Sequence, residues 1–211
     1  MLDQSLRAVV VPRLEAPARR LVMLGMTANQ LTAIGLIVGI AACLAVAAER
    51  WWLGLALWIA NRIIDGFDGV VARLRGPTEL GGFLDIMADF AVYGGVVVAV
   101  GFAVPEARVA ALVTFLAYYL SGSSFLAWSS LSERLQLGGG DGRSLNFPAG
   151  LAEGTETIAA MCLLLAFPQF AVEILWVWAA MVFISVGQRI WFVSRHLQRD
   201  RTDRAQRESA E

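Results

Sequence analysis

Long apolar stretches separated by short polar segments run along most of this chain. A membrane-crossing helix needs about 20 mostly apolar residues, and six stretches approach or exceed that length. They lie at residues 31–48, 51–72, 82–104, 108–131, 147–167 and 170–193. The pattern predicts an all-α membrane protein with six transmembrane helices. No linker is long enough to divide the chain, so residues 1–211 are expected to form a single domain.

The two ends of the chain differ from these stretches in composition. Residues 1–24 mix arginines with aliphatic residues and contain Pro12 and Pro17. This mixture is typical of an N-terminal interfacial amphipathic helix, broken near one of the prolines. A loose cytosolic tail is the alternative for this segment. Residues 198–211 are charged and of mixed sign, so we expect a partly ordered cytoplasmic tail there.

The overall composition agrees with a membrane location. Hydrophobic residues make up 57% of the 211 positions and charged residues 17%, which is more apolar than an ordinary soluble domain. All 17 basic residues are arginines, and most lie before the first predicted span, after the second, after the fourth and after the sixth. This asymmetry predicts that both termini face the cytoplasm, because positive residues concentrate on the cytoplasmic side.

Four aspartates interrupt the apolar pattern on the two sides of one turn. Asp65 and Asp68 are three residues apart in the second predicted helix, and Asp85 and Asp89 are four apart in the third. Each pair therefore lies on one helix face. Both pairs are 8–12 residues from Pro77 in the turn, a distance of roughly 12–18 Å at the helical rise per residue. Two antiparallel helices would bring the four carboxylates to one depth.

Such a cluster requires compensation of its negative charge. An aspartate at mid-bilayer costs roughly 2.5–3.5 kcal/mol, and neighbouring carboxylates also repel one another. Oxygen-only clusters suit Mg²⁺ or Mn²⁺, and two such ions can share four carboxylates and hold a diphosphate. We therefore expect two Mg²⁺ or Mn²⁺ ions on Asp65, Asp68, Asp85 and Asp89. A buried polar network without metal is the alternative.

Small residues and one arginine accompany the aspartates. Gly66, Gly69 and Ala72 recur every three residues in the second helix, which leaves room for a bulky group or for tight helix packing. Arg73 can offer a forked donor to a phosphate. Gly81 opens the third helix, where unpaired N–H groups favour an anion. Together these residues favour a phosphate-bearing ligand beside the carboxylates.

Residues 65–89 have the sequence DGFDGVVARLRGPTELGGFLDIMAD. This segment resembles the signature of the CDP-alcohol phosphatidyltransferases, which is D-x-x-D-G-x-x-A-R followed by G-x-x-x-D-x-x-x-D. Residues 26–35, MTANQLTAIG, are similar to the TPNxLT motif of the family's first span, with Ala28 in place of proline. Seven residues separate Arg73 from Gly81, where the family has eight. The resemblance covers nearly the whole chain and is closest to small bacterial inner-membrane members.

The resemblance implies transfer of a phosphatidyl group from CDP-diacylglycerol to an alcohol, with release of CMP, in phospholipid biosynthesis. It also implies a homodimer in the bacterial inner membrane and no nucleic-acid partner. It assigns the metals to Asp65, Asp68 and Asp85, and makes Asp89 both a metal ligand and the candidate base for the acceptor hydroxyl.

The same resemblance places the CDP moiety beside the second helix. Gly69 and Ala72 would line the cytidine site, and Arg73 would contact phosphate. Asn29 and Thr32, at the start of the first span, are further candidates for the nucleotide site. Capping of the first helix is the alternative role for both.

The acceptor alcohol must be inferred from other polar residues near the predicted cytosolic ends of spans four to six. The candidates are Arg134, Arg143, Arg189, Glu153 and Glu156. The arginines suit an acceptor phosphate, as in glycerol 3-phosphate or an inositol phosphate. The glutamates suit either a neutral polyol or amino alcohol, or an ion pair with Arg189.

Two other functions fit parts of the pattern. A Mg²⁺-dependent intramembrane prenyltransferase also holds a diphosphate on Asp-rich helices, but its paired motifs would be expected on two separate helix pairs. A non-enzymatic transporter or cation and proton relay could use the carboxylates. That function leaves Gly69, Ala72 and Arg73 without a role.

Overall fold

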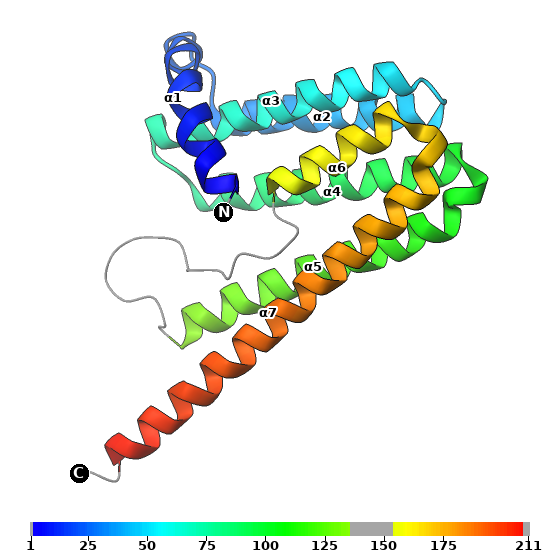
Figure 1. Cartoon of the computed structure of the whole chain (residues 1–211). Coiled ribbons are helices and arrows are strands. Elements are labelled where there is room, and N and C mark those ends of the chain that lie inside the picture. Colours follow the sequence, from blue (N-terminus) through cyan, green and yellow to red (C-terminus); the bar gives the residue numbers. More distant parts are fainter. Residues whose placement is uncertain (1, 136–153, 209–211) are drawn as a thin grey trace.

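A computed structural model describes residues 2–135 and 154–208, and every regular element in these two ranges is helical. The elements are α1 (Leu2–Met23), α2 (Ala28–Ala47), α3 (Trp51–Arg75), α4 (Glu79–Ala103), η1 (Pro105–Ala107), α5 (Arg108–Arg134), α6 (Gly154–Ala166), η2 (Pro168–Phe170) and α7 (Ala171–Glu208). Figure 1 shows α2, α3, α4 and α6 gathered in one bundle, whereas α5 and α7 run side by side and extend past it. The all-α prediction is confirmed.

Four helical stretches of the described chain are long and apolar enough to cross a membrane. They are Ala28–Ala47, Glu79–Ala103, Pro105–Arg134 and Pro168–Gln198. The second predicted span corresponds to α3, which has 25 residues but carries Arg62, Asp65 and Asp68 in its second half. The fifth corresponds to α6, which has 13 residues, and the start of that predicted span lies outside the described residues. The six-span prediction is thus confirmed for four helices.

The outer faces of these helices are apolar. Large hydrophobic side chains such as Ile37, Leu44, Phe102, Leu112 and Val177 are exposed. In water this surface would be unfavourable, whereas in a bilayer it faces hydrocarbon. The exposed apolar faces therefore support a membrane-spanning arrangement.

The buried core lies where α6 packs into the bundle. Met161, Leu164 and Leu165 of α6 are fully buried, together with Trp58 of α3 and Val96 of α4. A smaller cluster joins the C-terminal half of α1 to α2 and α3, through Ala18, Leu31 and Val71 among others. This second cluster fixes α1 beside the aspartate-bearing part of α3.

The two chain ends are more continuously helical than the sequence pattern indicated. Helix α1 continues through Pro12 and Pro17 without the expected break, although a proline inside a helix removes one backbone hydrogen bond and crowds the preceding turn. Helix α7 continues to Glu208, through most of the predicted tail. Its arginines, glutamines and alanines are good helix formers, and no glycine or proline interrupts residues 188–208.

A close approach of two helices sets the position of the bundle around α2. A Cβ atom on Gly39 of α2 would lie 2.4 Å from Cγ2 of Val92 on α4, closer than real contacts allow. Glycine at this position therefore lets α2 pack directly against α4. Helix α2 packs extensively against both α3 and α4, so it holds together the two helices that carry the aspartates.

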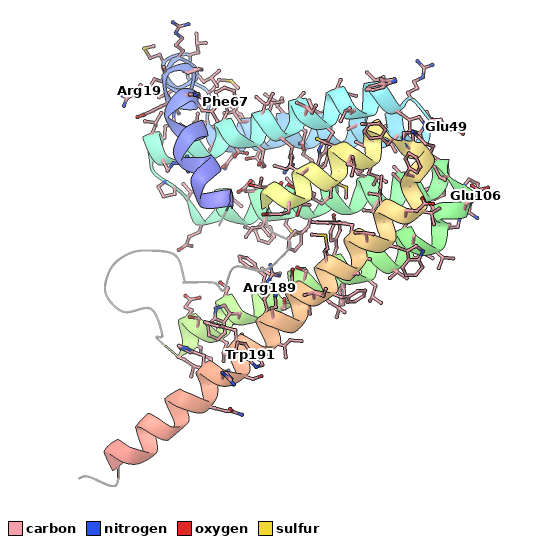
Figure 2. The ribbon with its side chains drawn as sticks, in the orientation of Figure 1. Arg19, Glu49, Phe67, Glu106, Arg189 and Trp191 are labelled. Atoms are coloured by element: carbon pink, nitrogen blue, oxygen red, sulfur yellow. The ribbon has the colours of Figure 1, made fainter. Side chains whose placement is uncertain are left out.

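The two ends of the bundle are distinguished by their polar residues. Figure 2 shows Glu49, between α2 and α3, at the same end as Glu106 of η1. Arg19 and Phe67 lie at the other end in the same view. Phe67 lies between the first two aspartates in the sequence, so the carboxylates belong to the end where α1 packs.

Candidate functional site

The turn between α3 and α4 reverses the chain beside the aspartates. Gly76 ends α3 with a φ angle of 96°, which glycine adopts without steric cost. Thr78 caps α4, because its hydroxyl accepts a hydrogen bond from the Gly81 N–H group at 3.1 Å. The two helices then diverge enough for α2 to pack against both of them. The predicted hairpin is therefore part of a three-helix arrangement.

Three of the four aspartates converge. One carboxylate oxygen each from Asp65, Asp68 and Asp85 lies within 4.8 Å of the other two. Asp68 is the most buried of them, with 5% of its surface exposed. Its Oδ2 accepts a hydrogen bond from the Thr32 hydroxyl at 2.9 Å. Oxygen ligands at this spacing fit a Mg²⁺ or Mn²⁺ ion, which binds carboxylates while keeping several waters.

The fourth aspartate is engaged differently. Oδ1 of Asp89 accepts a hydrogen bond from Nη1 of Arg62 at 2.8 Å, and the two side chains form an ion pair. The same Nη1 lies 3.7 Å from Oδ2 of Asp65. The Arg62 side chain is only 8% exposed, compared with 34% for the side chains of Asp65 and Asp89. Arg62 thus connects the two aspartate pairs across α3 and α4.

Arg62 is itself held by polar and aromatic neighbours. Its Nε and Nη2 atoms both donate to Oδ1 of Asn61, at 2.8 and 2.6 Å, and Nη1 donates to the Tyr93 hydroxyl at 2.9 Å. Its guanidinium carbon lies 5.1 Å from the Trp58 ring centroid and 4.6 Å from that of Tyr93. Such cation–π contacts are strongest where water is excluded.

The charge of the site is unbalanced. Four carboxylates and one guanidinium would leave three formal negative charges if all groups were ionised. A small cavity opens among these groups, lined by Asp65, Asp68, Asp89 and Arg62 with neighbouring residues of α2 and α4. Buried charges persist only when they are paired, protonated or bound to a metal. Together with the three converging oxygens, this imbalance favours a bound divalent cation over a polar network without metal.

The small residues of α3 face different surroundings. A Cβ atom on Gly69 would meet only Nη1 of Arg73, at 3.7 Å, so this side of α3 is open beside the first aspartate pair. A Cβ atom on Gly66 would instead lie 3.2 Å from Cδ1 of Leu14, on α1. Ala72 is half-buried and Arg73 is exposed. The open surface near the carboxylates is therefore formed by Gly69, Ala72 and Arg73, while Gly66 faces α1.

The structure shows which residue caps the start of α2 and which residues contact the aspartate-bearing helices. Thr27, rather than Asn29 or Thr32, caps α2, in a reciprocal capping box with Gln30. Capping as the role of Asn29 and Thr32 is therefore wrong. Thr32 instead contacts Asp68, as described above. A Cβ atom on Gly81 would lie 2.9 Å from Oδ1 of Asn29, so Asn29 packs against the first turn of α4.

The candidate acceptor residues are only partly described. Arg143 and Glu153 lie outside the described residues. Arg134 is exposed at the end of α5. Arg189 of α7, labelled in Figure 2, donates from Nη1 to the backbone oxygen and the hydroxyl of Ser121 on α5, at 3.2 and 2.7 Å. Glu156 lies in the first turn of α6, and its buried Oε2 has no hydrogen-bond partner among the described residues.

The contacts of Arg62 with the Trp58 and Tyr93 rings were not predicted from the sequence. Trp58, Arg62 and Asp65 are spaced four and three residues apart, and Tyr93 follows Asp89 by four. These spacings place the aromatic rings one helical turn from the charged groups. An arginine inside a predicted span, flanked at helical spacing by an aromatic residue and an aspartate, was the available signal.

Two sequence comparisons support one family. The profile described as CDP-alcohol phosphatidyltransferase matches residues 25–191. The inner membrane protein YnjF of Escherichia coli (strain K12) is 36% identical to this chain over 195 residues, which cover 90% of this chain and 94% of that protein. Both matches include the four aspartates and their flanking helices.

Solved structures show the same fold. Two crystal structures of the phosphatidylinositol phosphate synthase PgsA1 from Mycobacterium tuberculosis, one with CDP-DAG bound and one in complex with manganese and citrate, superpose with TM-scores of 0.66 and 0.67. Each is 20% identical to this chain and covers 84% of it, and the matches span 91% and 87% of those chains. At this identity the similarity shows a shared architecture.

Proposed function

Because the chain belongs to the CDP-alcohol phosphatidyltransferase family, as the resemblance predicted, we propose that it transfers the phosphatidyl group of CDP-diacylglycerol to a small alcohol and releases CMP. One observation carries this proposal: Asp65, Asp68 and Asp85 of the signature bring their oxygens within 4.8 Å of one another. In the reaction, the acceptor oxygen forms a bond to the β-phosphorus of the donor, and the bond from that phosphorus to CMP breaks. The family match favours this reaction over the prenyltransferase and ion-relay hypotheses.

The cluster of Asp65, Asp68 and Asp85 fits Mg²⁺ or Mn²⁺, since it offers hard oxygen ligands. A divalent cation held there would neutralise the diphosphate and stabilise charge on the leaving CMP. The manganese in one of the similar solved structures supports this choice of metal. Two ions, as the four carboxylates led us to expect, would need Asp89, whose carboxylate is paired with Arg62.

Asp89 is the candidate base for the acceptor. Its side chain is 34% exposed and lies beside the small cavity among the carboxylates. An alcohol is a poor nucleophile at neutral pH, so a carboxylate within hydrogen-bond reach assists by accepting its proton during attack. Arg62 would keep the Asp89 carboxylate oriented toward that position.

The CDP moiety is proposed to bind along the open side of α3. Gly69 leaves that side free of a side chain, Ala72 continues it, and Arg73 supplies an exposed guanidinium for a phosphate. Asn29 and Gly81, which are in contact, form the adjoining edge. Thr32 takes part through Asp68. Gly66 supports this site indirectly, by admitting α1 against α3.

The acceptor is proposed to bind between the aspartates and the paired helices α5 and α7. Arg189 and Arg134 would favour a phosphate ester, such as glycerol 3-phosphate or an inositol phosphate. Glu156, with a buried oxygen lacking a described partner, would favour an acceptor hydroxyl or amine. Arg143 and Glu153 are proposed for the same site from their sequence positions.

In the cell, we expect the protein to span the inner membrane with its six predicted helices, as a homodimer with both termini in the cytoplasm. The arginine distribution supports this orientation, since the last turn of α3 carries Arg73 and Arg75. The name of the E. coli relative supports the membrane. The lipid donor would then enter from the cytoplasmic leaflet and the alcohol from the cytoplasm.

The proposal is tested by CMP release from CDP-diacylglycerol by the purified full-length protein in detergent with Mg²⁺. The acceptors are glycerol 3-phosphate, inositol phosphate, inositol, serine and glycerol, and Asp85→Asn is the control because it keeps the shape of the side chain but removes a ligand charge. Acceptor-dependent release that the variant loses supports the proposal and identifies the alcohol. Failure of the protein to bind CDP-diacylglycerol or to release CMP with any acceptor contradicts it.

A further inference from the structure

We propose that Arg62 is a positioning residue that holds Asp89 apart from the metal cluster and supplies a fixed positive charge in place of a second ion. The substrate-free protein would therefore bind one divalent cation, on Asp65, Asp68 and Asp85. This inference rests on the proposed function, because it takes those three aspartates as metal ligands. The four carboxylates alone led us to expect two ions, and the proposal replaces that expectation with one ion.

The position of the guanidinium carries the argument. Nη1 of Arg62 lies 2.8 Å from Oδ1 of Asp89 on α4 and 3.7 Å from Oδ2 of Asp65 on α3. A second metal ion would need Asp89 together with a carboxylate shared with the first cluster, because Asp89 is the only one of the four aspartates outside that cluster. The arginine nitrogen therefore occupies the place that such a bridging ion would need.

The surroundings of Arg62 make this placement firm. Asn61 accepts hydrogen bonds from two nitrogens of Arg62. Asn61 is itself anchored, because its Nδ2 donates to the Gly35 backbone oxygen at 2.8 Å. Tyr93 accepts a further hydrogen bond, and the rings of Trp58 and Tyr93 lie within 5.1 Å of the guanidinium carbon. An arginine keeps its charge in proteins. Moving it aside would leave a buried cation without these partners.

The arrangement also explains why Asp89 is absent from the cluster of converging oxygens. A carboxylate that accepts a charge-assisted hydrogen bond at 2.8 Å is fixed in orientation. If the guanidinium were removed, Asp89 would be left without its ion-pair partner and would attract another cation. The identity of residue 62 thus determines how many metal ions the four aspartates hold.

The experiment is a Mn²⁺ titration of the full-length protein in detergent, without substrate, in which electron paramagnetic resonance measures free Mn²⁺. We expect one Mn²⁺ per chain for the unmodified protein and for Asp89→Asn, with the dissociation constant of the variant within threefold of the unmodified value. We expect Asp68→Asn to weaken binding at least tenfold. Arg62→Met should bind a second Mn²⁺, whereas Arg62→Lys, which keeps the charge, should bind one. Size-exclusion chromatography establishes that each variant is folded and monodisperse.

Two Mn²⁺ per chain in the unmodified protein would overturn the inference and leave the proposed function intact. A tenfold or greater loss of affinity in Asp89→Asn would also overturn it, because Asp89 would then be a ligand, and this variant avoids any doubt about the folding of Arg62→Met. A folded Arg62→Met that still binds one ion would overturn the claim that the guanidinium replaces a second one. No Mn²⁺ binding by the unmodified protein would instead contradict the proposed function, and the inference with it.

Discussion

The Thr32 hydroxyl on α2 donates a hydrogen bond to Oδ2 of Asp68 on α3 across 2.9 Å. The bond joins the first membrane helix to the most buried of the four carboxylates. The same hydroxyl lies 3.1 Å from the backbone oxygen of Ala28, so its single proton is shared between two acceptors. The carboxylate is the stronger acceptor when ionised.

The first prediction follows from this bond. Thr32→Val removes the hydroxyl and keeps the shape, so the buried Asp68 carboxylate loses a donor worth about 1 kcal/mol. We expect kcat/KM for CMP release to fall about fivefold, the factor that this energy corresponds to. Thr32→Ser, which keeps the hydroxyl, is the matched control and should retain most of the activity. A loss of activity in Thr32→Ser without a loss in Thr32→Val would show that the methyl group, and not the hydrogen bond, matters.

The second prediction concerns the first turn of α4. A Cβ atom on Gly81 would lie 2.9 Å from both Oδ1 of Asn29 and Oγ1 of Thr78, whereas a Cβ atom on Gly82 would meet nothing within 4 Å. Gly81→Ala should therefore displace Asn29 or the Thr78 cap. We expect loss of the cap to cost about 1 kcal/mol of stability and the KM for CDP-diacylglycerol to rise.

Gly82→Ala is the control for that experiment, since it adds the same methyl group one residue further along the helix. Its melting temperature and KM should match those of the unmodified protein. Thermal unfolding in detergent and initial rates of CMP release provide the two measurements. If both variants behave alike, the contact between Asn29 and Gly81 has no part in substrate binding.

The third prediction concerns the open side of α3. The Cβ atom of a leucine at position 69 would meet only Nη1 of Arg73 within 4 Å. Leucine also favours a helix over glycine by roughly 1 kcal/mol. Gly69→Leu should therefore keep or raise the melting temperature while raising the KM for CDP-diacylglycerol at least tenfold, by filling the proposed cytidine site. An unchanged KM would place the nucleotide elsewhere.

Much of this architecture could be predicted from the sequence, because apolar runs of this length fold as helices in a membrane. The beginnings of α3 and α5 at Trp51 and Arg108 agree with the predicted spans. The end of α7 could not be predicted in this way. Hydropathy marks where a helix leaves the bilayer, near residue 193, but backbone hydrogen bonds continue in water as far as Glu208.

The candidate site, too, could be predicted from the sequence only in part. The three-residue spacing of Asp65 and Asp68 puts both on one face of α3, and the similar distances of Asp68 and Asp85 from the turn place Asp85 of α4 at the same depth. The pairing of Arg62 with Asp89 spans 27 residues and depends on how α3 and α4 diverge around α2. That divergence is determined by contacts such as Gly39 with Val92, which hydropathy does not record.

The fourth prediction tests that contact. Gly39→Ala would bring its methyl group to 2.4 Å from Cγ2 of Val92, so α2 and α4 must separate. Overpacking of this kind costs about 1–3 kcal/mol, and we expect a lower melting temperature in detergent. Gly187→Ala on α7 is the matched control, since its added Cβ atom would meet nothing within 4 Å. Equal melting temperatures for the two variants would mean that the helices accommodate the methyl group without separating.

The last prediction concerns the acceptor. Arg189 uses Nη1 to hold Ser121 on α5, and its guanidinium offers the planar fork of N–H donors that suits a phosphate. Arg189→Gln should raise the KM for a phosphate-bearing acceptor about tenfold or more, and leave the KM for CDP-diacylglycerol unchanged. Arg189→Lys should recover only part of this loss, because it keeps the charge without the fork.

Arg195→Gln is the control for general loss of positive charge near the same end of α7, since Arg195 is exposed and lies over the Trp191 ring. It should leave both KM values unchanged. A rise in the KM for CDP-diacylglycerol in Arg189→Gln would move this arginine to the donor site. If neither KM changes, and Glu156→Gln instead raises the KM for a neutral polyol or an amino alcohol, the acceptor is recognised through its hydroxyl or amine groups and not through a phosphate.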